Sequence, residues 1–314
     1  MRSFLGKIDH WLSAEPQHII GTRILQAVIG VMLCFRIATE IPFAGYLWGP
    51  NGIHTTEDST YSFGVTLGSF LDKLFFSSMA GVYSLMFILF SGAILLILNI
   101  RTRIAVVICA FAFVLIDSRL PAINDGGDNI MRLTLIYMFL LLSNPRKENI
   151  SKLKIWLHNI GVAAIIVQLM ILYETSGFMK ASGDKWQNGT AMYTISNVEW
   201  FSLPQFQQLF TNPYMCTIAT YVPMFIMIFF PIAIFSRAKL LWIFFGICLH
   251  IGIGYMMGLV VFSSVMIALE LFLITDDEYK RLGIIFSRSK IGRFISPKRV
   301  MVRQYLNPKS EYND

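Results

Sequence analysis

The sequence predicts an all-α fold, a polytopic membrane helical bundle with about eight transmembrane helices. The first observation is composition: 55% of the 314 residues are hydrophobic and 14% are charged, whereas a soluble domain carries about 25% charged residues. The second is the mean hydropathy of the chain, which is +0.60. The third is the recurrence of apolar runs near the length of about 20 residues that a helix needs to cross a bilayer.

Eight apolar segments are the predicted spans, and polar or basic stretches separate them. They are residues 19–43, 79–98, 104–116, 130–142, 155–173, 214–235, 240–256 and 259–274. The segment at 130–142 is short, so we expect its helix to begin within the preceding polar turn, 117–129. Pro42 is expected to end the first helix, and Pro223 and Pro231 to kink the sixth.

The spans define the predicted domain organisation. Residues 1–18 form a cytoplasmic or interfacial segment, 19–274 a transmembrane domain, and 275–314 a basic cytoplasmic tail. Residues 1–17 lack the apolar core of a cleavable signal peptide, and residues 4–12 have the pattern of a short amphipathic helix on the bilayer surface. The apolar stretch 63–76 is predicted to be an interfacial or re-entrant helix.

Lysine and arginine are distributed unevenly between the loops, and this predicts the orientation of the chain. With a cytoplasmic N-terminus and eight spans, the basic segments all fall inside. They are the N-terminal segment, 99–103, 143–154, 236–239 and the tail. The positive-inside rule therefore places both termini in the cytoplasm. The net charge of +7 reports this topology rather than a nucleic-acid partner.

The same topology brings polar residues from distant segments towards the outer leaflet. They are Asp125, Asp128, Arg132, Glu174, Lys180 and His250. The cysteines form no C-x-x-C pair and the histidines have no metal-ligand spacing, so the sequence does not support a metal site. The four cysteines are interpreted as small core residues.

Residues 173–193 concentrate ionisable and aromatic side chains at a membrane edge, and three glycines are expected to break the stretch. Lys180 there is either an interfacial lysine that reaches water or a lysine partly buried in an outward-facing cavity, where desolvation would make it a general base. Lys185, next to Trp186, is the less favoured candidate.

Two further groups have both a structural and a functional interpretation. His250 is either a hydrogen-bonded core histidine or a proton shuttle that faces a ligand. Asp128 and Arg132 are spaced i, i+4, which favours an ion pair that caps the fourth span. Arg36 and Glu40 have the same spacing and are expected to pair within the first span.

The chain resembles the membrane domain of vitamin K-dependent γ-carboxylases, which is shared with the bacterial HTTM group. The resemblance covers about residues 15–275 and rests on a G-x-x-K motif, a W-x-x-G motif and a later histidine-bearing helix. The matching residues are Gly177, Lys180, Trp186, Gly189 and His250, followed by F-S-S-V-M at 262–266. The turn D-G-G-D-N-I-M-R at 125–132 and the small size look most like the sporulation-delaying protein B branch.

The resemblance implies a catalytic site and a cofactor. In the carboxylases, the lysine of this stretch deprotonates vitamin K hydroquinone, so the role of base would fall on Lys180, with His250 as a second catalytic residue. A menaquinone or vitamin K-type quinone would then contact Arg132, Asp128 and Trp186. The chain differs from the carboxylases in having Met179 before its lysine, and no counterpart of their large lumenal domain is expected.

The sequence is compatible with three functions. The branch implies a membrane component of a peptide-toxin maturation system, which processes or modifies an exported precursor peptide at the outer face of a bacterial plasma membrane. A soluble partner of the SdpA type would act with it. The alternatives are a quinone-dependent, carboxylase-like membrane enzyme and a non-enzymatic scaffold or binder.

Overall fold

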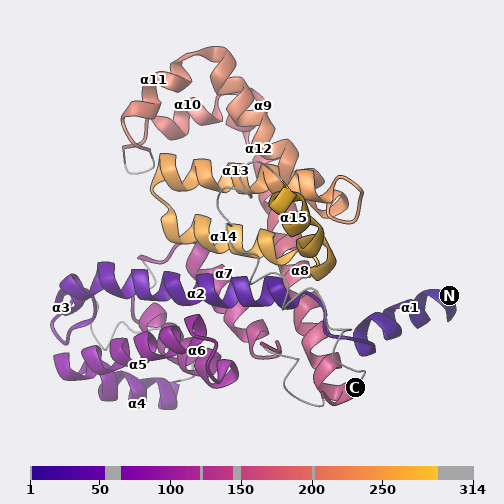
Figure 1. Cartoon of the computed structure of the whole chain (residues 1–314). Coiled ribbons are helices and arrows are strands. Elements are labelled where there is room, and N and C mark those ends of the chain that lie inside the picture. Colours follow the sequence, from indigo (N-terminus) through magenta and orange to yellow (C-terminus); the bar gives the residue numbers. More distant parts are fainter. Residues whose placement is uncertain (1, 54–64, 121–122, 144–149, 200–201, 289–314) are drawn as a thin grey trace, which may run out of the picture.

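The computed structural model describes residues 2–53, 65–120, 123–143, 150–199 and 202–288, and every regular element in these ranges is a helix (Figure 1). The first half contains α1 Arg2–Ser13, α2 Ile19–Glu40, η1 Ile41–Phe43, α3 Ala44–Trp48, α4 Val65–Phe76, α5 Met79–Ile97, α6 Thr102–Arg119 and α7 Gly126–Met138. The second half contains α8 Lys152–Ala181, α9 Asp184–Gln187, α10 Ala191–Ser196, α11 Gln205–Thr211, α12 Pro213–Ala233, α13 Lys239–Met257, α14 Val260–Phe272 and α15 Asp276–Arg288.

Within the described residues, five helical segments are long and apolar enough to cross a membrane. They are Ile19–Trp48 (α2 with η1 and α3), α5, α8, α12 and α13. Helix α14 is also apolar but has 13 residues, and at 1.5 Å per residue it is about 20 Å long. The predicted all-α membrane fold is therefore observed, with five candidate membrane-spanning helices.

Helix α2 lies at the centre of the bundle, between α14 on one side and α5 on the other (Figure 1). Leu25, Ile29 and Leu33 are fully buried, and their spacing of four residues forms one apolar stripe along the helix. Gly30 allows α2 and α5 to approach closely, because a Cβ at this position would lie 2.8 Å from the carbonyl oxygen of Ala93. Small residues are typical of such close helix contacts in membranes.

Contacts between helix ends show that α2 runs antiparallel to α5 and to α14. At one end of the bundle, Arg23 of α2 donates to the carbonyl oxygen of Leu96 in α5 at 2.8 Å. At the same end, Asp276 accepts hydrogen bonds from the backbone of Ile19 and Ile20 at 2.9 and 2.7 Å. The start of α2 is thus held to the end of α5 and to the start of α15, which follows α14.

The opposite end is held by two buried ion pairs. Arg36 of α2 contacts Asp128 in the first turn of α7. Arg119, at the end of α6, donates to Asp72 of α4 at 2.9 Å. These contacts bring together segments that are predicted from the sequence to lie on one side of the membrane.

The helix boundaries confirm several predictions and correct one. Helix α7 begins at Gly126, within the polar turn, and α2 ends at Glu40, two residues before Pro42. The expected break at Gly177 is wrong, because α8 continues to Ala181. Gly177 instead allows α8 to pack on α12, since a Cβ there would lie 2.8 Å from Cγ1 of Ile228.

The regions outside the spans are partly helical. The predicted helix at 63–76 is seen as α4 from residue 65, and residues 63–64 lie outside the described part. The predicted amphipathic segment at 4–12 lies within α1. The basic tail begins as helix α15, and its remainder, 289–314, lies outside the described residues.

Candidate functional site

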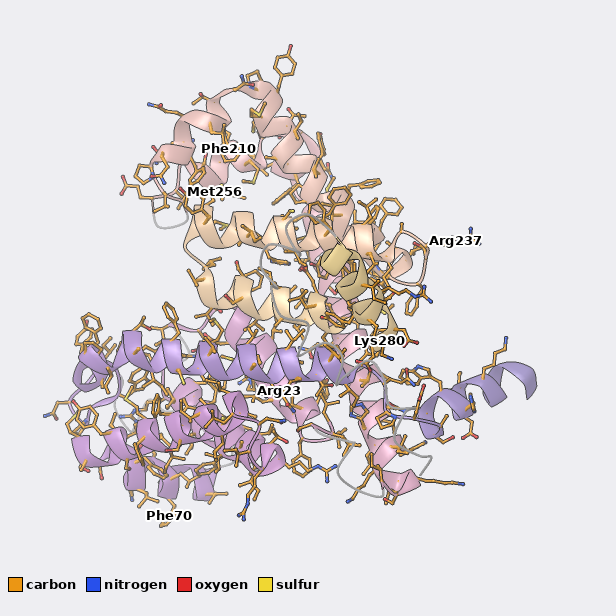
Figure 2. The ribbon with its side chains drawn as sticks, in the orientation of Figure 1. Arg23, Phe70, Phe210, Arg237, Met256 and Lys280 are labelled. Atoms are coloured by element: carbon orange, nitrogen blue, oxygen red, sulfur yellow. The ribbon has the colours of Figure 1, made fainter. Side chains whose placement is uncertain are left out.

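A cavity of about 710 Å³ lies between α8, α12 and α13, and the short helices α9, α10 and α11 contribute to its walls. Most of the lining side chains are apolar, including Met215, Met227 and Phe262. Phe210 of α11 and Met256 of α13 both line the cavity, and Figure 2 labels them where the short helices lie beside α13. A large apolar cavity with a few polar groups is the usual form of a small-molecule site.

Lys180 and Trp186 form one polar edge of this cavity. Lys180 lies in the last turn of α8, and Gly183 separates that helix from α9, which carries Trp186. The Nζ atom of Lys180 lies 5.3 Å from the centroid of the Trp186 ring, which is a cation–π distance. Lys180 is half-buried, whereas Lys185 is exposed and does not line the cavity. Of the two lysines considered from the sequence, Lys180 is therefore the one in the cavity wall, and its catalytic role stays a prediction.

His250 lies deeper in the cavity wall and belongs to a buried polar cluster. Its Nε2 atom is 3.0 Å from the hydroxyl oxygen of Tyr173 on α8 and 3.4 Å from Oε1 of Glu270 on α14. The Tyr173 hydroxyl donates to the same Glu270 oxygen. All three side chains are at most 1% exposed. Helix α8 and the consecutive helices α13 and α14 therefore meet at one hydrogen-bonded cluster.

The surrounding residues hold this cluster in place. The ring of Phe230 stacks on Tyr173 with a centroid distance of 3.8 Å, and Phe262 contacts the edge of His250 at 5.6 Å. Gly246 leaves room for the carboxylate, because a Cβ at this position would lie 2.5 Å from Oε1 of Glu270. Gly246 and His250 are four residues apart, on the same face of α13.

Two atoms of the cluster are buried but lack a hydrogen-bond partner among the described residues. They are Nδ1 of His250 and Oε2 of Glu270. Burial of an unpaired polar atom costs free energy unless another group satisfies it. His250 also lines the cavity, so one of these two atoms belongs to a side chain of the cavity wall.

Asp128 and Arg132 belong to a second cluster, which does not line the cavity. Asp128 pairs with Arg36, which also donates from Nε to Glu40 at 2.8 Å. The Asp128 side chain accepts from the backbone of Asp125 in a capping box, so its predicted capping role is confirmed.

The expected pairing of Asp128 with Arg132 is wrong. Arg132 instead contacts Asp117 at 3.3 Å and Asn129 at 2.9 Å. The i, i+4 spacing permitted that pair, but Arg36 of a neighbouring helix reaches Asp128. The six polar residues that were expected towards one leaflet are therefore divided, with Lys180 and His250 at the cavity and Asp125, Asp128 and Arg132 in the second cluster. Glu174 is exposed on α8 and belongs to neither group.

Tyr173 and Glu270 are the site residues that the sequence analysis missed. Glu270 lies in the otherwise apolar segment V-V-F-S-S-V-M-I-A-L-E-L-F. An ionisable residue inside a span is costly and usually functional. The position of Glu270 in a predicted span therefore indicated a candidate site residue. Tyr173 carries no comparable signal, because a tyrosine near the end of a span is common.

The fold and this site define an all-α membrane protein with a buried ionisable cluster beneath an apolar cavity. Among known proteins, the chain is similar to the uncharacterized protein YitO of Bacillus subtilis (strain 168), with 23% identity over 199 residues. The alignment covers 58% of this chain and 63% of YitO, which is less than two thirds of that protein. No protein-family model matches the chain, and no solved structure matches it.

Proposed function

We propose that this protein is the membrane component of a peptide-toxin maturation system. It acts on an exported precursor peptide at the outer face of a bacterial plasma membrane, together with a soluble partner of the SdpA type. The observation that carries the proposal is the cavity in which Lys180, Trp186 and His250 meet. These residues belong to the motifs that resemble the membrane domain of the γ-carboxylases and the HTTM group, and the turn at 125–132 and the small size favour the sporulation-delaying protein B branch.

The proposed orientation has both termini in the cytoplasm and eight spans. The spans would be the five long helices together with α6, α7 and α14. The contacts at the helix ends support this arrangement, because basic residues gather at the end that holds the start of α2. Figure 2 shows Arg237 and Lys280 towards that end, away from Phe210 and Met256 at the cavity. The positive-inside rule then favours an outward-facing cavity.

A pair of lysine variants tests the proposed function. In cells that make the protein, Lys180→Ala is expected to abolish the mature peptide in the culture medium, measured by mass spectrometry at equal protein levels. Lys185→Ala is the matched control, because Lys185 is five residues away, exposed and outside the cavity. Mature peptide at normal yield from Lys180→Ala would contradict a chemical role for Lys180 and favour a non-enzymatic scaffold.

A quinone-dependent, carboxylase-like activity is the second candidate, and the cavity is the observation that favours it. Its volume and apolar lining fit a ring with an isoprenoid tail, and Lys180, His250 and Trp186 fit the polar end of such a molecule. A bound quinone would supply redox chemistry, while Lys180 would accept a proton as general base.

The contacts proposed for Arg132 and Asp128 do not fit this quinone site, since neither residue lines the cavity. The candidate activity therefore needs only the residues at the cavity. Mass spectrometry of extracts from the purified protein is expected to detect a quinone, and the mature peptide would gain mass relative to its unmodified sequence. Absence of both would contradict this second function.

A further inference from the structure

We propose that Tyr173, His250 and Glu270 form a proton relay that takes a proton from a weakly acidic hydroxyl group of an apolar ligand in the cavity. The ligand binds through its apolar part, and its hydroxyl group faces Nδ1 of His250. The relay rests on the proposed use of the cavity as a ligand site, but not on the identity of the peptide substrate. It adds a base that is separate from Lys180.

The direction of the hydrogen bonds determines the resting state of the relay. The only proton of the Tyr173 hydroxyl is donated to Glu270, so the contact between His250 and Tyr173 needs the imidazole Nε2–H as its donor. A neutral imidazole with a proton on Nε2 has an unprotonated Nδ1. That atom is the buried nitrogen that lacks a partner among the described residues and belongs to a side chain of the cavity wall.

The transfer is balanced at every atom. The O–H bond of the ligand breaks, and its proton binds Nδ1 of His250. The proton on Nε2 moves to the oxygen of Tyr173, and the hydroxyl proton of Tyr173 moves to Oε1 of Glu270. His250 and Tyr173 each gain one proton and lose one, so the net result is a ligand oxyanion and a neutral carboxylic acid. No group is oxidised or reduced in the transfer.

The geometry favours a relay over a purely structural cluster. A structural cluster is most stable when all its buried polar atoms are paired, yet this one leaves an atom unpaired at each end of the chain of hydrogen bonds. Gly246 and Phe230 fix the positions of Glu270 and Tyr173, which keeps the transfer distances short. Lys180 lies apart from the chain, with its ammonium group over Trp186.

The probe for the test is 4-nitrophenol, a mostly apolar ring with one weakly acidic hydroxyl group and a coloured anion. It is added to the purified full-length protein in detergent, and the ionised fraction of the bound probe is measured by absorbance as a function of pH. The wild-type protein is expected to lower the apparent pKa of bound probe by about one unit or more relative to Glu270→Gln and Tyr173→Phe. Lys185→Met, at an exposed position outside the cavity, is the control and is expected to behave like wild type. Lys180→Met is measured beside it, because a loss of ionisation in that variant alone would make Lys180 the base.

An infrared difference spectrum provides a readout from the wild-type protein itself, which Glu270→Gln then assigns to one carboxyl group. When the probe binds wild-type protein, a band of a protonated carboxyl group is expected to appear, and Glu270→Gln should lack it. Three results would overturn the relay: no binding to the wild type, equal ionisation in wild type and Glu270→Gln, or loss of ionisation in Lys180→Met alone. If the relay fails in this way while Lys180→Ala still abolishes peptide maturation, the proposed function stands without it.

Discussion

Gly246 of α13 faces the carboxylate of Glu270 on α14 so closely that a Cβ at position 246 would lie 2.5 Å from Oε1. The same Cβ would lie 3.1 Å from the hydroxyl oxygen of Tyr173. The absence of a side chain at this one position is therefore what lets three helices bring the buried cluster together.

The first prediction concerns this contact. Gly246→Ala is expected to lower the free energy of unfolding by about 1–3 kcal/mol, because an extra methyl group in a tightly packed site forces its neighbours to move. Gly252→Ala, six residues along the same helix, is the control, since a Cβ there meets no atom within 4 Å. Alanine at that position should be neutral or stabilising by up to about 1 kcal/mol. Equal unfolding curves for the two variants in detergent would contradict the tight contact.

The second prediction concerns the Arg36–Asp128 pair, in which both side chains are less than a tenth exposed. Arg36→Met is expected to cost about 3–5 kcal/mol of stability, because it leaves Asp128 buried without its cation. Adding Asp128→Asn to Arg36→Met should recover part of the loss. Additive effects of the two substitutions in a double-mutant cycle would show that the residues do not interact.

The third prediction tests the orientation of the chain. In a background without native cysteines, Lys185→Cys is expected to react with a membrane-impermeant maleimide in intact cells. Arg237→Cys should react only after the cells are permeabilised. Both positions are exposed in the structure, so burial does not account for a difference. Labelling of Arg237→Cys in intact cells would contradict an outward-facing cavity.

The fourth prediction concerns pH and His18, which precedes α2 and contacts the carbonyl oxygen of Phe272 through Nδ1 at 2.8 Å. Burial lowers the pKa of His18 from its ordinary value of 6.5. The unfolded chain therefore binds the proton more readily, and His18 reduces stability as the pH falls below that value. The melting temperature should drop between about pH 7.5 and pH 5.5, and less so in His18→Gln. An identical drop in the variant would exclude His18 as the cause.

Much of the helical fold could be predicted from the sequence, because apolar runs report helices directly. The start of α7 inside its polar turn and the end of α2 before Pro42 were both predictable from breaker and capping residues. Gly177 was misleading, since a glycine that ends a soluble helix can instead allow close helix packing in a membrane. The number of spans beyond the five long helices stays a prediction.

The candidate site was only partly predictable. Lys180, Trp186 and His250 could be selected from motif spacing, and the structure brings them to one cavity. The contact between Arg36 and Asp128 joins residues 92 positions apart, and no local pattern predicts it. The same is true of Tyr173 and Glu270, whose contact depends on how α8 and α14 pack around Gly246.

The central claim is that maturation of the peptide takes place in the cavity. The most direct test is the yield of mature peptide from cells that carry Gly252→Phe, compared with Gly252→Ala at equal protein levels. Gly252 lines the cavity, and no atom lies within 4 Å of an added Cβ, so the phenyl group would occupy open space and leave Lys180 and His250 unchanged. We predict loss of mature peptide with Gly252→Phe and normal yield with Gly252→Ala. A normal yield from both variants would contradict the account.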